Sequence, residues 1–330
     1  MSDELKLGLK AIRDWAVIKG SPHARALGIE PMRTRKHEAW VKLPYDPRFI
    51  GNPETGVIHG GVMTTLLDNV CATAVVAAIG VLKPMATLDI RIDYMRPAVP
   101  GKDVIAHGSC FKVGKLVAFT RGTAYHEAPE EPIATAAAAF MFVGERGADV
   151  ASGAGENQRA ADFDVADKPA RAPPVLETVP EPVHAEASRR AESVEKLQAL
   201  LDEIAYARFL GLVIDRKGDE FTTILPFERK LIGNPLVPAL HGGVIGAFLE
   251  MTALLQLIAD STSVTLPKTI DITIDFLRSG RPADTFARAV VSRLGRRVAN
   301  VRAEAWQETH EKPIAALHGN FLVTPGDDVA

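Results

Sequence analysis

The sequence has few cysteines and no long hydrophobic run, and each shortage excludes a class of protein. Cys71 and Cys110 are its two cysteines, and neither has the spacing of a zinc site or of a disulfide framework. A reducing compartment fits this usage best. The longest apolar stretch, residues 72–82, is about half the length of a membrane span, and the charged N-terminal segment lacks the apolar centre of a signal peptide. We therefore expect a cytoplasmic protein that does not enter a membrane.

A strong charge of either sign is also missing. The net charge of −3 and the pI near 6.3 give no general attraction to nucleic acid or to an anionic membrane, so an anionic ligand would need a local basic patch. The sequence has no GxGxxG, Walker, GxSxG, HExxH or CxxC motif. Nucleotide redox chemistry, NTP hydrolysis, serine hydrolysis and zinc chemistry therefore have no support, and we expect neither a metal nor a bound cofactor.

The chain repeats itself. An offset of 182 maps residues 43–61 onto 225–243, and nine of these nineteen positions are identical. The register continues from 87–97 to 269–279, and then runs on at an offset of 181. A hydrophobic fraction of 47% in 330 residues can fill two cores. We therefore predict a tandem duplication, with one repeat at 1–143, a largely irregular linker at 144–187 and a second repeat at 188–330.

Each repeat has the same predicted order of elements. A leading amphipathic segment and a short strand precede a loop rich in Gly, Pro and Asn. A helix follows, from about 62 to 79 and from about 244 to 258, and three strands close the repeat. The helix is apolar nearly all round, which predicts that it is enclosed. Strands that follow a buried helix predict an α+β fold in which an antiparallel sheet wraps around a central helix.

A double glycine opens both helices. Gly60 and Gly242 each follow a histidine, His59 or His241. A helix N-terminus exposes unpaired N–H groups and the positive end of the helix dipole, and glycine allows another group to approach that backbone closely. Such an end can hold a carbonyl oxygen as it becomes an oxyanion. The alternative is that the glycines only allow a tight turn and the histidine caps the helix.

An acid stands nine residues after each histidine. Asp68 and Glu250 lie roughly 13 Å along their helices, too far to serve the N-terminus of the same helix. If the two helices lie antiparallel across a pseudo-twofold axis, each acid reaches the glycines of the other repeat. An acid within an apolar helix is costly unless it is paired or functional. A carboxylate beside an oxyanion site can activate water or attack an acyl carbon, which suits hydrolysis of an activated ester.

The strings GVIHGGVMTTLLDNV, ATLDIRIDYMRPA and GKLVAFTRGTAY resemble the hotdog-fold acyl-CoA thioesterases of the phenylacetate-degradation type. The resemblance covers most of residues 21–143 and, more loosely, 205–323. It implies a tandem double hotdog, in which two antiparallel sheets each wrap a central helix and join as a pseudo-dimer with sites between the halves. The implied catalytic residues are Asp68 and Glu250 as base or nucleophile, Gly60 and Gly242 as N–H donors, His59 and His241 as supports of the loop, and Thr87 and Thr269 as water-positioning hydroxyls.

The implied substrate is an acyl-CoA, so coenzyme A belongs to the substrate and is not a cofactor. Asn52 and Asn234 are implied substrate or water contacts, although Asn in such loops also serves turns. Candidates for a basic rim that holds the phosphates are Arg96, Lys115, Arg278, Arg296 and Arg297. We expect the Asp68 site to be competent and the Glu250 site to be slower or specialised. A non-catalytic acyl-CoA-binding module and an enoyl-thioester hydratase are the alternatives, and the pseudo-dimers could pair further.

Overall fold

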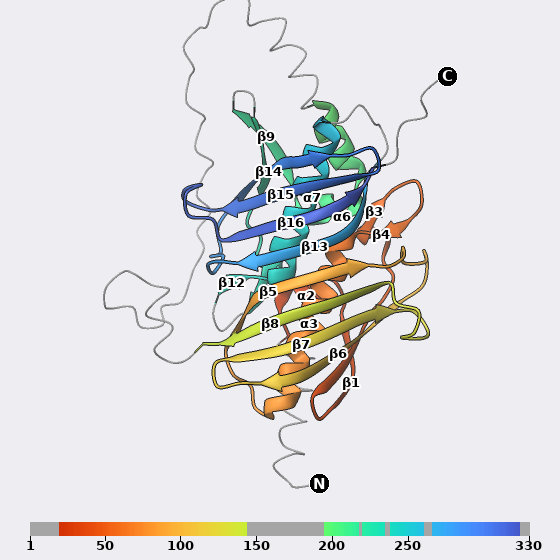
Figure 1. Ribbon diagram of the computed structural model, residues 1–330, viewed down its shortest axis with the longest axis vertical. Helices are drawn as coiled ribbons and strands as arrows, with labels where there is room; N and C mark the ends of the chain where they lie inside the picture. The colour runs from red at the N-terminus through yellow and green to blue at the C-terminus, as the bar shows by residue number, and fades with distance from the viewer. Residues whose placement is uncertain (1–19, 144–194, 218–219, 235–237, 261–265, 324–330) are drawn as a thin grey trace, which may run out of the picture.

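The computed structural model describes residues 20–143, 195–217, 220–234, 238–260 and 266–323 (Figure 1). The predicted linker, 144–187, and the predicted start of the second repeat at 188 lie outside the described residues, so these boundaries stay predictions.

Within residues 20–143 the first repeat contains two helices, a 3₁₀ turn and eight strands. In chain order these are α2 (Pro22–Ala26), β1 (Glu30–Arg35), β2 (Glu38–Leu43), η1 (Pro47–Phe49), β3 (Ile50–Asn52), β4 (Val57–Ile58), α3 (Gly60–Ile79), β5 (Met85–Tyr94), β6 (Val104–Val113), β7 (Val117–Tyr125) and β8 (Ala134–Phe142).

The second repeat follows the same order after a helical segment at 195–203. Its elements are α6 (Ala205–Leu210), β9 (Val213–Lys217), β10 (Glu220–Leu225), η2 (Arg229–Leu231), β11 (Ile232–Asn234), β12 (Ala239–Leu240), α7 (Gly242–Asp260), β13 (Lys268–Phe276), β14 (Thr285–Leu294), β15 (Val298–Trp306) and β16 (Ala315–Leu322).

The predicted central helices are confirmed, but the prediction of three closing strands is wrong, because four strands follow each helix. The strand that was missed is β6, because its sequence shows only a weak alternation of large apolar residues. Its inward positions carry small residues such as Ala106, Gly108 and Cys110, since α3 packs very close to this strand. A Cβ added at Gly108 would lie only 2.6 Å from the carbonyl oxygen of Val70 in α3. Close helix packing therefore removes the large apolar residues that mark a strand in a sequence.

The two predicted sheets form one continuous sheet of twelve strands, in the order β1-β2-β6-β7-β8-β5-β13-β16-β15-β14-β10-β9. The repeats meet where β5 pairs antiparallel with β13. Arg91 faces Thr273 at the centre of this pairing, with Ile90 opposite Ile274 and Ile92 opposite Ile272. Figure 1 shows the strands of the first repeat, in orange and yellow, continuing into the blue strands of the second. The fold is the predicted α+β tandem double hotdog, with its halves joined edge to edge.

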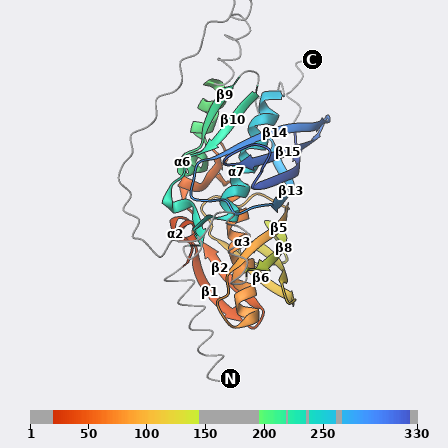
Figure 2. The same ribbon diagram turned by 90° about the vertical axis from the view of Figure 1, so that its left-hand side faces the viewer.

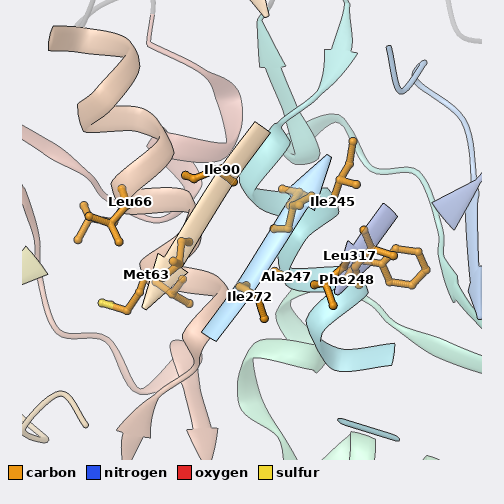
Figure 3. Close-up of a cluster of buried hydrophobic side chains, with 14 of the residues drawn as sticks. Met63, Leu66, Ile90, Ile245, Ala247, Phe248, Ile272 and Leu317 are labelled. Carbon is orange, nitrogen blue, oxygen red and sulfur yellow. The ribbon is translucent and has the colours of Figure 1, made fainter. Parts of the chain in front are cut away.

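The sheet curves around the two long helices. In Figure 2, α3 lies between β1 and β2 on one side and β5 and β8 on the other. Both long helices are long and apolar enough to cross a membrane by length and composition, but 78% of each apolar window is buried inside the molecule, as in the core helix of a soluble fold. Figure 3 shows the shared core on both sides of the β5–β13 pairing, with Met63, Leu66 and Ile90 from the first repeat and Ile245, Ala247, Phe248, Ile272 and Leu317 from the second.

The long helices cross in antiparallel orientation at their glycine-rich ends. A Cβ added at Gly61 would overlap Ala247 of α7, and one at Gly243 would overlap Thr65 of α3. These two contacts run in opposite directions along the helices, as the antiparallel prediction requires. Glycine is needed here because any side chain would push the helices apart.

Each short leading helix packs across the pseudo-twofold axis onto the other repeat. The α2 helix lies against η2 and β11, and α6 lies against η1 and β3. Phe209 of α6 joins the two arrangements, because its ring centroid lies 5.3 Å from that of Phe49 and 6.3 Å from that of His23. The repeats therefore exchange helices as well as sharing a sheet.

Candidate active site

Asp68 of α3 lies at the N-terminus of α7. A Cβ added at Gly242 would lie 3.2 Å from Oδ2 of Asp68, and Nδ1 of His241 lies 3.5 Å from the same oxygen. The Asp68 residue is 6% exposed, and the nearby N–H of Gly243, which donates to His241, favours its charged form. The acid of the first repeat therefore meets the His-Gly-Gly motif of the second.

Glu250 of α7 lies at the N-terminus of α3 in the same way. A Cβ added at Gly60 would lie 2.5 Å from Oε1 of Glu250. The Glu250 residue is 1% exposed. The hydroxyl of Tyr94, at the end of β5, lies 3.5 Å from Oε2 of Glu250. Both predicted pairings across the axis are therefore present, and the two carboxylates stand beside opposite helix ends.

Both site histidines cap the helix that follows them. Nδ1 of His59 accepts a hydrogen bond from the N–H of Gly61 at 2.9 Å, and Nδ1 of His241 accepts one from Gly243 at 3.0 Å. Burial lowers the pKa of His59 to about 4, and it lowers the pKa of His241 against the opposing effect of Asp68. A neutral ring that accepts at Nδ1 carries its proton on Nε2. The histidines thus hold the glycine turn in place.

A bulge aims one threonine of each repeat at its carboxylate. Oγ1 of Thr87 donates to Oδ1 of Asp68 at 2.9 Å, and Oγ1 of Thr269 donates to Oε1 of Glu250 at 2.7 Å. The pairing of β5 shifts register between Thr87 and Asp89, and that of β13 shifts at the equivalent place. Strict alternation would turn Thr87 away from the helix that Ile90 faces, so the extra residue of the bulge is what brings it inward.

Burial weakens the acidity of both carboxyl groups. It raises the pKa of Glu250 to about 7, against the hydrogen bonds from Thr269 and Tyr94. It also raises the pKa of Asp68, while His241, Thr87 and the N–H of Gly243 favour the charged form. An acid whose pKa lies near neutrality can accept and return a proton at physiological pH. Raised carboxyl pKa values beside a helix N-terminus are typical of catalytic sites.

The leading helices cover the two histidines. His23 of α2 places its ring centroid 5.6 Å from that of His241, and Tyr206 of α6 places its ring centroid 5.5 Å from that of His59. His23 and Tyr206 occupy equivalent positions, 183 residues apart, and both are fully buried. Each site is therefore closed by a residue that belongs to the repeat providing its carboxylate.

The predicted asparagines are only partly described. Oδ1 of Asn52 accepts hydrogen bonds from the N–H groups of Glu54 and Thr55, at 3.0 and 3.2 Å, so this oxygen stabilises the turn. Asn234 ends β11, and its side chain lies outside the described part of the structure. Substrate contact by either asparagine stays a prediction.

The predicted basic residues fall into two groups. Arg96 and Arg278 are tied to hairpin loops, since Arg96 forms an ion pair with Glu131 at 3.0 Å and Arg278 donates to the carbonyl oxygen of Pro313 at 2.6 Å. No contact within the described ranges brings either arginine to a site carboxylate. The other three predicted residues lie in or beside hairpin turns, namely Lys115 between β6 and β7, and Arg296 and Arg297 between β14 and β15.

The second of these turns borders a cavity of about 250 Å³. The cavity is lined by Arg293, Gly295, Arg296, Arg297, Val298, Asn300 and Asn320. Strand pairing aligns Val298 with Leu322 and Leu322 with Lys268, the residue before Thr269. Two strand spacings of about 4.8 Å therefore put the backbone of this turn about 10 Å from Thr269. Asn300 and Asn320 alternate with buried residues, so the cavity lies on the outer face of the sheet, whereas Thr269 turns inward to Glu250. The β6–β7 turn stands in the same relation to Thr87, since Val117 pairs with Met141 and Met141 with Ala86.

Sequence reasoning missed Tyr94 as a site residue. It ended an alternating strand and therefore counted as a core position. The available signal was the exchange of Tyr94 for Phe276 between two otherwise similar strands. The covering residues His23 and Tyr206 could not have been found in this way, because only the three-dimensional exchange of helices brings them to the site.

Comparison with known proteins agrees with the two-repeat organisation of the chain. Residues 55–133 and 238–314 each match the family model described as "Thioesterase superfamily". The medium/long-chain acyl-CoA thioesterase YigI of Escherichia coli K12 is 31% identical over 133 residues, which span 36% of this chain and 84% of YigI. Phenylacetate-type membership is not tested by these matches and stays a prediction.

Two solved structures share the fold along most of the chain. The tesB protein of Mycobacterium avium subsp. paratuberculosis has a TM-score of 0.57 at 12% identity, covering 92% of this chain and 100% of its own. A hot dog fold protein of Alicyclobacillus acidocaldarius has a TM-score of 0.53 at 11% identity, covering 87% of this chain and 94% of its own. At these identities the similarity is one of fold.

Proposed function

The chain belongs to the thioesterase superfamily and is a thioester hydrolase, and on that premise we propose that it hydrolyses acyl-CoA to a free acid and coenzyme A at two sites between its repeats. The proposal rests on one observation. Each buried carboxylate, Asp68 or Glu250, lies against the glycine end of the opposite long helix, at Gly242 or Gly60. A proton acceptor beside unpaired N–H groups is what hydrolysis of a thioester requires.

The proposed reaction begins with the thioester carbonyl at the helix end. The N–H of Gly61 is already bonded to His59, so the N–H of Gly60 is the donor proposed for the carbonyl oxygen. Glu250 then removes a proton from a water that attacks the acyl carbon, or attacks that carbon itself to give an anhydride that water opens. In the water route the carbon–sulfur bond breaks and the proton taken up by the carboxyl is returned to the leaving thiolate. In the anhydride route the carbon–sulfur bond breaks as the carboxylate becomes acylated, and the leaving thiolate takes its proton from the water that opens the anhydride and restores the carboxylate. Asp68 and Gly242 have the same roles at the other site.

The threonines prepare the carboxylate in this scheme. A hydroxyl that donates to Asp68 or Glu250 favours the charged, basic form. It also leaves its own oxygen lone pairs free to hold the attacking water. Thr87 and Thr269 are therefore proposed to orient both the base and the water.

The proposed phosphate contacts are the basic hairpin turns. Within the described residues, no ion pair joins Arg293, Arg296 or Arg297 to a carboxylate, so their guanidinium groups are available to an anion. The coenzyme A arm of a substrate held at Thr269 would leave past the start of β13 and meet this turn. The equivalent turn of the first repeat has two lysines, Lys112 and Lys115, and would serve the Asp68 site less strongly.

We propose a medium or long acyl chain. The relative YigI is named for medium- and long-chain acyl-CoA, and both carboxylates project from long helices whose other buried residues are mostly apolar. The test is a panel of acyl-CoA esters from acetyl-CoA to palmitoyl-CoA, with release of the free thiol recorded by a thiol reagent. Hydrolysis that rises from acetyl-CoA to decanoyl-CoA would support the proposal. Protein that binds decanoyl-CoA but releases no thiol would instead be an acyl-CoA-binding module.

A further inference from the structure

The two sites differ in the aromatic residue that faces the glycine. Tyr94 ends β5 and Phe276 ends β13, at equivalent positions of the two repeats. A Cβ added at Gly60 would lie 3.0 Å from the hydroxyl of Tyr94, and one at Gly242 would lie 3.2 Å from Cζ of Phe276. The two rings thus take the same place at the two helix ends. Only the Glu250 site has a hydroxyl there.

A second residue supports this hydroxyl. Oγ1 of Thr64 lies 3.2 Å from the Tyr94 hydroxyl and 3.4 Å from the carbonyl oxygen of Gly60. The position equivalent to Thr64 in the second repeat is Gly246. The second repeat therefore lacks both members of the pair, and its Phe276 ring faces the helix end without a polar neighbour at this position.

The Tyr94 hydroxyl makes only a weak hydrogen bond as a donor to the groups around it. Its contact with Glu250 is 3.5 Å long, at the limit of a hydrogen bond, and Thr64 can act as donor to the phenolic oxygen. The phenolic proton is then directed toward Oε2 of Glu250, at the helix end that begins with Gly60. Burial and the neighbouring Glu250 raise the pKa of Tyr94 well above its usual value, so the hydroxyl keeps this proton.

We propose that Tyr94 is a further catalytic residue of the Glu250 site, where its hydroxyl donates a second hydrogen bond to the carbonyl oxygen of the bound thioester, beside the N–H of Gly60. The proposal rests on the hydrolase function proposed above. A preorganised second donor stabilises the charge that develops on that oxygen. The Asp68 site has Phe276 in this place and works without the donor. The duplicated chain thus has two chemically distinct sites.

The test uses the Asp68→Asn protein, in which Glu250 is the remaining carboxylate. Adding Tyr94→Phe should lower kcat for decanoyl-CoA by about 100-fold, the effect typical of losing one oxyanion donor, with a much smaller change in KM. The matched control is Tyr125→Phe in the same background, which removes a buried phenol on β7, two strands along the sheet from Tyr94, and should leave kcat within about twofold.

A pH profile separates this role from a purely electrostatic one. If Tyr94 only adjusted the charge of Glu250, Tyr94→Phe would move the midpoint of the profile and leave the alkaline plateau intact, and that result would overturn the proposal. The proposal predicts that the plateau itself falls. An Asp68→Asn protein with no activity would also overturn it, because Glu250 and Tyr94 would then form no working site. Failure of the hydrolase function looks different, since wild-type protein would itself release no thiol.

Discussion

The hydroxyl of Thr269 donates a 2.7 Å hydrogen bond to the carboxylate of Glu250, from a strand that bulges to make the contact. Replacing Thr269 with valine keeps the shape and removes the donor. A hydrogen bond to a charged group contributes about 1.5–3 kcal/mol, so the pKa of Glu250 should rise further, by about one unit or more. In the Asp68→Asn protein the midpoint of the pH–rate profile should therefore move upward.

Thr273→Val is the matched control for this change. Thr273 lies on the same strand, at the centre of the β5–β13 seam and on the face away from the helices. The pH–rate midpoint of this variant should equal that of its parent. If Thr269→Val also left the midpoint in place, Thr269 would not be tuning the carboxylate.

The ionisation of Glu250 should destabilise the fold. Its pKa is about 7 in the folded protein and 4.5 without burial, so the folded state favours the protonated acid, and stability is lost as the pH rises through this range. Glu250→Gln cannot ionise. It should match wild type near pH 4.5 and be more stable by up to about 3 kcal/mol at pH 8.5, as measured by urea unfolding. The matched control is Glu203→Gln, at an exposed position, which should show no such difference. A pH-independent gap for Glu250→Gln would contradict the account.

The two helix-end glycines should tolerate alanine unequally. A new methyl at Gly60 would lie 2.5 Å from Oε1 of Glu250, while one at Gly242 would lie 3.2 Å from Oδ2 of Asp68. Gly60→Ala must therefore displace the carboxylate, whereas Gly242→Ala needs an adjustment of a few tenths of an ångström. We expect Gly60→Ala to lower the rate of the Glu250 site at least about tenfold and to cost about 1–3 kcal/mol of stability. Gly60→Ala is assayed in the Asp68→Asn protein and Gly242→Ala in the Glu250→Gln protein, so that one site alone is active in each. Equal effects of the two substitutions would show that the close approach at Gly60 has no consequence.

The arginine turn should bind the nucleotide end of the substrate. In the Asp68→Asn protein, where the Glu250 site alone is active, the double change Arg296→Ala with Arg297→Ala should raise KM for decanoyl-CoA at least about tenfold, by loss of charge-assisted hydrogen bonds. It should leave KM for the decanoyl thioester of N-acetylcysteamine unchanged, because that substrate has no phosphate. Arg302→Ala, on an exposed position of β15, is the control. A similar rise in KM for both substrates would mean that the turn acts on the fold and not on the phosphates.

The duplication made much of this architecture predictable. A fixed offset of 182 residues, with His, Gly and Gly retained in both copies, indicated paired helix ends. The position of Asp68 and Glu250, nine residues along, required an antiparallel partner helix. That argument needs only the length of an α-helix and the cost of a buried charge, and it predicted which acid meets which glycine.

Other features depend on contacts that a sequence does not display. The bulges that turn Thr87 and Thr269 inward break the alternation on which strand reasoning depends. The strand β6 carries small inward residues because α3 lies against it. Tyr94 looked like part of the core because its ring is apolar along most of its length and only its hydroxyl reaches the site.

The most direct test of the central claim compares wild-type protein with Asp68→Asn, Glu250→Gln and the double variant, all assayed for thiol release from decanoyl-CoA. Loss of a catalytic carboxylate typically costs two to four orders of magnitude. The account predicts that each single variant keeps the activity of its remaining site, and that the double variant loses at least about 100-fold relative to wild type while still unfolding cooperatively. A double variant that hydrolyses as fast as wild type would contradict the account.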